Sequence, residues 1–292
     1  MKKIVLILIL LFSGLRMYAQ SDAMLTQQWL SRINCNPAAT GNTNDVDIFL
    51  IHRTQWSSFN GKAPQTSLLN ATNYFNNINS GIGLSLVYDK DGDMYTNYNA
   101  KFVYAYHLIF SDIALLSLGL GLNLQNRSID FDKLDLSTGD PMYEGRGKES
   151  ETNIDFDFGL EFNSDRFTLG ASLNRIGKTA VEKLNPFKSG QQFYAYTRYR
   201  ISVIEGFDLA PAASYVYANH LDIWEASVTG FIAEQVWLGF AYRWDLALAF
   251  SAGVEFGNFR IGYAYDHYLK QSTDLGATHE VMLSVKIPHK RY

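Results

Sequence analysis

The chain has 292 residues, a formal net charge of −4 and a single cysteine. One cysteine excludes an intramolecular disulfide and a cysteine-based zinc cluster, and the acidic balance argues against nucleic acid as a partner. The 18 Tyr, 19 Phe and 22 Gly beside only 6 Pro are typical of a membrane barrel, in which outward apolar residues alternate with inward polar ones.

The first residues carry the pattern of a secretory signal. Lys2 and Lys3 are followed by the apolar run Ile4 to Phe12 and by the small-residue site Met17-Tyr18-Ala19. We predict a signal peptide over 1–19 and a mature chain that starts at Gln20. Its 22 basic and 29 acidic side chains give a formal charge of −7. A retained membrane helix is disfavoured, because the apolar run is far shorter than the roughly 20 residues that a span needs.

Residues 20–45 form an N-terminal lead, which we expect on the periplasmic side. Trp29 and Leu30 are its large apolar groups. They either plug the lumen, engage a partner or pack against the interior of the barrel itself.

Period-two alternation recurs along residues 46–292. From Asn153 to Asn163, for example, apolar residues at even positions alternate with polar residues and a glycine at odd ones. Many such strands without a convincing helix between them indicate an up-and-down antiparallel sheet that closes into a barrel and so hides its edges. We predict an all-β transmembrane barrel of about fourteen strands, near 46–54, 65–75, 81–89, 95–109, 112–126, 153–163, 166–175, 191–204, 207–219, 222–232, 235–244, 246–257, 259–268 and 278–287.

The connections between these strands sort by length. Every second one is tight, and the longest, 127–152, 176–190 and 269–277, all belong to the other set. Two connections of that other set, near 219–220 and 245, are also short, so the rule holds in one direction only. Outer-membrane barrels combine short periplasmic turns with longer external loops, so the pattern predicts a bacterial outer-membrane location. Tyrosines and tryptophans near strand ends, such as Tyr98 and Trp237, fit aromatic girdles or plain core packing.

Side-chain parity predicts charges of both signs on the inner face. A buried carboxylate without a partner is unfavourable, so these charges should pair and brace or plug the lumen. The inner set comprises Asp155, Asp157, Glu161, Arg198, Arg200, Arg243, Glu255, Arg260, Asp266 and Glu280, together with Lys101, Glu225 and Lys286.

We find no pattern that indicates a catalytic, cofactor or metal site. The acidic turn from Asp89 to Asp93 lacks the glycine and glutamate of a calcium-binding EF-hand at positions six and twelve, and is better read as a hairpin turn. No hydrolase, metalloprotease or phosphate-binding motif occurs. We therefore expect no enzyme, no cofactor and no metal.

The chain resembles the PorP/SprF family of type IX secretion outer-membrane proteins. The motifs that carry this resemblance are Asn36-Pro37-Ala38 with Gly41; Arg53, Gln55-Trp56, Phe59, Gly61, Pro64 and Thr66; Gly81-Ile82-Gly83-Leu84; Arg260 to Asp266; and His279-Glu280-Val281-Met282-Leu283. Two features depart from the family pattern: Ala39 or Thr40 where an aromatic is usual, and the tail from Pro288 to Tyr292.

The resemblance implies a non-enzymatic role in type IX secretion or gliding motility. The implied partners are the periplasmic ring lipoprotein complex, or a secreted adhesin with a type-B C-terminal domain. It also suggests partner contacts through the lead and the first hairpin, at Trp29, Leu30, Asn36, Pro37, Arg53, Gln55 and Trp56. The alternative that stays open is an outer-membrane channel for small or hydrophobic solutes.

Overall fold

The computed structural model describes residues 24–43, 45–58, 62–111, 113–133, 147–177, 190–218, 221–269 and 276–288. The strands in this part of the chain are β1 Asp45–Thr54, β2 Gln65–Phe75, β3 Ser80–Asp91, β4 Tyr95–Ser111, β5 Ala114–Asp130, β6 Lys148–Ser164, β7 Phe167–Ile176, β8 Gln192–Tyr199, β9 Ile201–Ile204, β10 Phe207–Ala218, β11 Leu221–Ile232, β12 Val236–Arg243, β13 Ala247–Phe256, β14 Phe259–Tyr268 and β15 Thr278–Pro288. Four 3-10 helices accompany them: η1 Gln28–Leu30, η2 Pro37–Ala39, η3 Asn76–Ile78 and η4 Phe131–Lys133.

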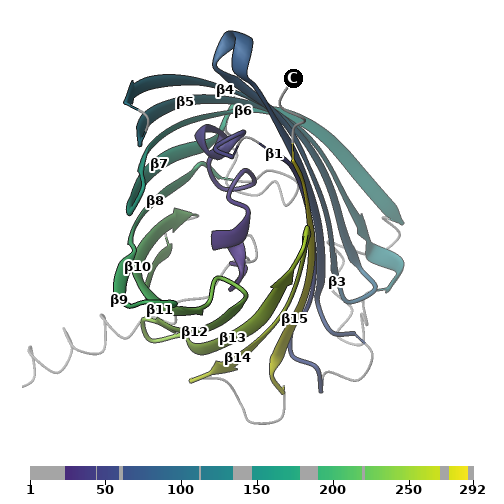
Figure 1. Cartoon of the computed structure of the whole chain (residues 1–292). Coiled ribbons are helices and arrows are strands. Elements are labelled where there is room, and N and C mark those ends of the chain that lie inside the picture. The colour runs from purple at the N-terminus through teal and green to yellow at the C-terminus, as the bar shows by residue number, and fades with distance from the viewer. Residues whose placement is uncertain are drawn as a thin grey trace, which may run out of the picture.

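The strands form one antiparallel sheet that closes into a barrel (Figure 1). Strand β1 pairs with both β2 and β15, and β10 pairs with β11, so the described sheet is continuous around the ring. Segments β8 and β9 both pair with β10 and are one strand interrupted at Arg200. The barrel therefore has fourteen strands around its circumference, and the predicted fold and strand number are confirmed.

The two ends of the barrel differ in their connections. At one end, called the short-turn end, the strands are joined through 76–79, 112–113, 165–166, 205–206, 233–235 and 257–258. Ala233 and Glu234 both have positive φ angles, 50° and 58°, as a tight hairpin turn that matches strand twist requires. The other end, called the long-connection end, carries the four longest connections, 55–64, 131–147, 177–191 and 269–277, together with the short ones at 92–94, 219–220 and 244–246.

Alternation separates an apolar outer face from a polar inner face. In β1, Phe49, Ile51 and Arg53 are buried inside, whereas Ile48 and Leu50 are exposed outside. Around the barrel, leucine, phenylalanine, tyrosine and isoleucine side chains stay exposed on the outer face, which suits contact with lipid.

No helix in the described ranges is long and apolar enough to cross a membrane.

Two strands are longer than the alternation alone predicts. β5 reaches Asp130 and β6 begins at Lys148, so their ladder continues past the apolar band toward the long-connection end. Opposite charges face each other along this extension, as Asp130 opposite Lys148 and Arg127 opposite Glu151. Cross-strand pairs of opposite charge stabilise such a ladder beyond the apolar band.

Candidate functional site

The N-terminal lead lies inside the barrel and crosses it lengthwise (Figure 1). Asn42 contacts Glu161 on β6, three residues before that strand ends at the short-turn end. At its other end, the carbonyl of Met24 accepts a 3.0 Å hydrogen bond from Arg53, one residue before β1 ends at the long-connection end. The lead therefore extends along most of the length of the lumen.

A row of small residues lets the lead approach the wall closely. Strand register places these residues side by side on β3 to β7: Gly81, Ala105, Gly119, Gly159 and Ser172. We call this row the glycine shelf. A Cβ added at Gly119 would overlap the backbone of Ala38, and one at Gly159 would overlap the side chain of Asn36. The shelf thus explains why glycine stands at these inner positions.

The helix η2 sits on the glycine shelf and is capped by Asn36. The Asn36 side chain accepts a 2.9 Å hydrogen bond from the Ala38 amide, and Pro37 occupies the first helical position. The same side chain donates 3.0 Å hydrogen bonds to the Leu160 carbonyl and the Tyr196 hydroxyl. One fully buried residue therefore both starts the turn and fixes it to two strands.

The first anchor of the lead is an ion pair between Arg32 and Glu161. Arg32 donates two hydrogen bonds of 3.0 Å through Nε and Nη2, and Glu161 has no exposed surface. Tyr196, Asn42 and Asn163 also donate to this carboxylate. Burial, the largest single influence, opposes the charge on Arg32, but Glu161 and Tyr196 together outweigh it and hold the pKa of Arg32 above its ordinary value.

The second anchor is a buried charge network near the long-connection end. Arg53 pairs with Asp266 at 2.9 Å and with Glu280, while Arg243 pairs with Asp266 at 2.8 Å and Glu225 at 2.7 Å. Thr26 of the lead joins this network: its amide donates to Glu280 at 2.9 Å and its hydroxyl to Asp266 at 2.6 Å. The lead is thus bound to β1, β12, β14 and β15.

Apolar groups of the lead fill the space between the two anchors. Leu25 and Leu30 pack with Phe49, Ile51, Leu68, Trp237 and Met282. The Trp29 ring meets Tyr196 edge to face at a centroid distance of 5.6 Å, and the Arg198 guanidinium lies 5.4 Å from the Trp29 ring centre. Both Trp29 and Leu30 thus pack against side chains of the barrel interior.

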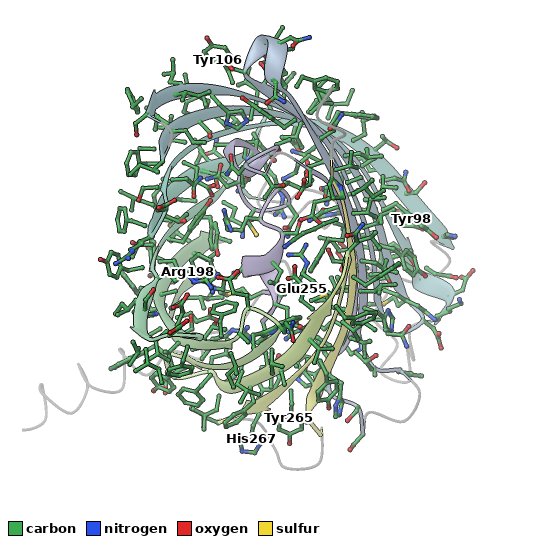
Figure 2. The ribbon with its side chains drawn as sticks, viewed as in Figure 1. Tyr98, Tyr106, Arg198, Glu255, Tyr265 and His267 are labelled. Atoms are coloured by element: carbon green, nitrogen blue, oxygen red, sulfur yellow. The ribbon has the colours of Figure 1, made fainter. Side chains whose placement is uncertain are left out.

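The remaining inner charges also have neighbours that compensate or cover them. The pairs are Asp157 with Lys101 at 2.6 Å, Arg260 with Asp47 at 2.8 Å, Glu255 with Lys286 at 3.2 Å, and Arg200 with Asp208 at 2.7 Å. Asp155, on the inner face of β6, is partly buried. Figure 2 shows Arg198 and Glu255 directed into the barrel, whereas Tyr98, Tyr265 and His267 project from its outer surface.

The candidate partner contacts fall into two groups. Trp29, Leu30, Asn36, Pro37 and Arg53 are engaged inside the barrel through the interactions above. Gln55 and Trp56 directly follow β1 at the long-connection end, where Trp56 lies 6.4 Å from Tyr268 between ring centres.

Sequence reasoning missed Thr26, Arg32 and Tyr196, although each holds the lead in place. The signal that points to them is the glycine set at inner positions of β3, β5 and β6. An inner glycine in a wide barrel leaves room for another backbone, and within the described ranges the lead fills that room at Gly81, Gly119 and Gly159.

Two cavities in the described part of the chain lie on the inner face. One of about 60 Å³ lies between the lead and the wall from β2 to β8, with Asn34, Lys101 and Asp157 among its lining residues; at roughly 10–15 Å³ per molecule, it holds a handful of waters. The other, of about 640 Å³, is a vestibule at the short-turn end, lined by Arg200, Phe231 and Glu234. Within the described ranges, no group of three or more His, Cys, Asp or Glu is arranged to hold a metal.

Comparison with known families matches residues 17–285 to the family described as "Type IX secretion system membrane protein PorP/SprF". A comparison with curated protein sequences found no match. Among solved structures, the toluene transporter TodX of P. putida is 12% identical, with 88% of this chain and 94% of that chain covered and a TM-score of 0.53. The Ralstonia pickettii toluene transporter TbuX is 13% identical, with 88% of this chain and 93% of that chain covered and a TM-score of 0.53. A Pseudomonas aeruginosa FadL homologue is 12% identical, with 87% of this chain and 92% of that chain covered and a TM-score of 0.50. At these identities the likeness is one of fold.

Proposed function

Because the chain belongs to the PorP/SprF family of type IX secretion system membrane proteins, we propose that it is a sealed docking barrel of that system in the outer membrane. Its role is non-enzymatic. It supports export or surface attachment of an adhesin with a type-B C-terminal domain, or docks the periplasmic ring lipoprotein complex.

The observation that carries this proposal is the anchored lead in the lumen. A channel for solutes needs a continuous path, whereas here residues 24–42 are joined to the wall by Glu161 at one end and by Asp266 and Glu280 at the other. Opening the lumen would separate several buried charges from their partners, which is strongly unfavourable.

With the lumen filled, the two rims are the surfaces available to partners. By the general rule for outer-membrane barrels, the short-turn end faces the periplasm and the long-connection end faces outward. The vestibule at the short-turn end exposes Glu234, whose side chain is 79% accessible, beside the partly accessible Arg200. We assign this rim to a periplasmic partner, and the outer rim with Gln55 and Trp56 to an exported one.

Site-specific photocrosslinking in outer membranes tests the assignment. A photoreactive phenylalanine replaces Glu234 in one variant and Trp56 in another, and a third variant carries it at the lipid-facing Phe102 as control. We expect Glu234 to capture a periplasmic lipoprotein of the ring, or Trp56 to capture a secreted adhesin, with neither captured at Phe102. Capture of neither partner from either rim would contradict the docking role.

Planar-bilayer conductance tests the alternative of a solute channel. The purified barrel should give no large, stable openings, because its lead fills the lumen. Reproducible, solute-selective conductance of the unmodified protein would reverse the conclusion in favour of a channel.

A further inference from the structure

An apolar groove of about 420 Å³ crosses the outer face of the barrel over β1 to β6. Its floor is a row of residues that strand register places side by side: Leu50, Leu69, Leu86, Ala100 and Leu124. All point outward, opposite to the buried inner residues of the same strands. Ala100 is the one small side chain in this row, so it leaves a slot between Leu86 and Leu124.

The groove ends at a polar row one step nearer the long-connection end. This row contains Ser67, Tyr88, Tyr98, Asn126 and Thr152, again side by side in register. The Tyr88 and Tyr98 rings lie 4.9 Å apart between centroids, and Asn126 donates a 2.8 Å hydrogen bond to Thr152. Tyrosines and hydroxyl groups of this kind mark the level at which a barrel meets lipid headgroups.

The spacing of aromatic residues along β4 agrees with that level. Tyr98 and the outward Tyr106 are eight residues apart, which is about 27 Å along a strand. At a strand tilt of about 40°, this corresponds to roughly 20 Å across the membrane, near the usual height of an apolar band. The groove therefore lies within the hydrocarbon region, directly below the headgroups at the long-connection end.

We infer that this groove binds an acyl chain of lipopolysaccharide from the outer leaflet, with the headgroup at the polar row. Leu86 and Leu124 are two strand spacings apart, about 10 Å, so the slot over Ala100 is one hydrocarbon chain wide and too narrow for a helix about 10 Å in diameter. An added strand would find no backbone partner, because the strands that form the groove are already paired on both sides. An acyl chain has no polar group to satisfy.

The headgroup side of the groove carries a cation that suits a phosphorylated lipid. Lys90 follows Tyr88 by two residues on the same outward face of β3. It forms an exposed pair with Asp93 at 3.1 Å, a kind of interaction that is weak enough in water to be exchanged for a lipid phosphate.

Lipid analysis of the purified protein tests this inference. The wild-type protein is extracted from outer membranes in mild detergent, and bound lipid is identified by native mass spectrometry. We expect about one lipopolysaccharide per barrel, at least fivefold less for Ala100→Phe, and wild-type occupancy for Ala252→Phe. Ala252 is the matched control, since it is exposed on the outer face of β13 between Leu238 and Tyr263.

Several results would overturn the inference. These are a wild-type protein without bound lipopolysaccharide, a phospholipid in its place, or equal loss from Ala100→Phe and Ala252→Phe. If Ala100→Phe abolished binding of a second copy or of another protein while the bound lipid was kept, the groove would be a protein-binding site instead. Heat-dependent mobility in gels reports folding, and Ala100→Leu replaces the phenylalanine variant if that variant does not fold.

Discussion

Removal of the Arg32 guanidinium should release the lead from the barrel wall. In Arg32→Met, the Glu161 carboxylate stays fully buried but loses the only cation that touches it in the described part of the chain. Breaking such a pair from one side costs about 3–5 kcal/mol. Tyr196, Asn42 and Asn163 still donate to Glu161, so the lower value applies. About 3 kcal/mol corresponds to a roughly 150-fold increase in the undocked fraction of the lead.

Cys35 reports this undocking, because it is the only cysteine and lies three residues after Arg32. Its sulfur donates a 3.3 Å hydrogen bond to Gln28, and its carbonyl accepts from Ser172 and Asn174 on β7. The rate of maleimide alkylation at pH 8 in detergent micelles should therefore rise about 100-fold in Arg32→Met. Partial recovery is expected in the double variant Arg32→Met with Glu161→Gln, since no lone carboxylate then stays buried.

Arg200→Met is the matched control for this measurement. Arg200 also forms ion pairs, with Asp208 and Glu234, but its side chain is 35% exposed and these pairs lie at the short-turn rim. Its loss should change the alkylation rate of Cys35 less than threefold. The reasoning is refuted if Arg32→Met also stays within threefold of the wild-type rate.

Three further outcomes test other parts of the structure. Gly119→Ala should raise the Cys35 alkylation rate about 5- to 150-fold, because overpacking against the lead costs about 1–3 kcal/mol. Gly230→Ala, whose added Cβ meets only side-chain atoms, should leave the Cys35 alkylation rate unchanged. Equal alkylation rates in Gly119→Ala and Gly230→Ala would show that close packing on the glycine shelf does not hold the lead in place. Burial raises the pKa of the Cys35 thiol to about 11. In the released lead the thiol regains an ordinary pKa of about 8.5, so the wild-type rate should rise with pH and level near pH 9. A continued rise of about tenfold per pH unit up to pH 10 would show that the docked, buried thiol itself reacts and that Cys35 does not report undocking. Leu122→Arg, on the outer face at the middle of the band, should lower the free energy of unfolding in vesicles by about 2–4 kcal/mol. Phe110→Arg at the rim should cost under about 1 kcal/mol, and equal urea midpoints would contradict the assigned membrane level.

Local patterning made most of the barrel predictable. The alternation from Asn153 to Asn163 reports a strand with two unlike faces wherever it lies, because successive side chains point to opposite sides. Where the pattern weakens, the boundaries shift: Lys148 to Thr152 continue β6 through cross-strand pairing with β5, which no single segment reveals. Arg200 likewise interrupts a strand that was predicted as one piece.

The candidate site was harder to predict, because its parts are distant in the chain. Parity placed Glu161 and Asp266 on the inner face but could not name their partners. Arg32 lies 129 residues from Glu161, and Thr26 lies 240 residues from Asp266. Such pairs are fixed only when the sheet closes and the lead folds into it.

The sequence by itself determined that this chain forms a fourteen-stranded membrane barrel, since strand alternation and turn length are local properties that survive without any knowledge of contacts. Only the tertiary structure decided what occupies the lumen. The lead has no alternation pattern from which its position could be predicted. Its position follows from the glycine shelf and the two buried charge clusters, which form only after the barrel has closed.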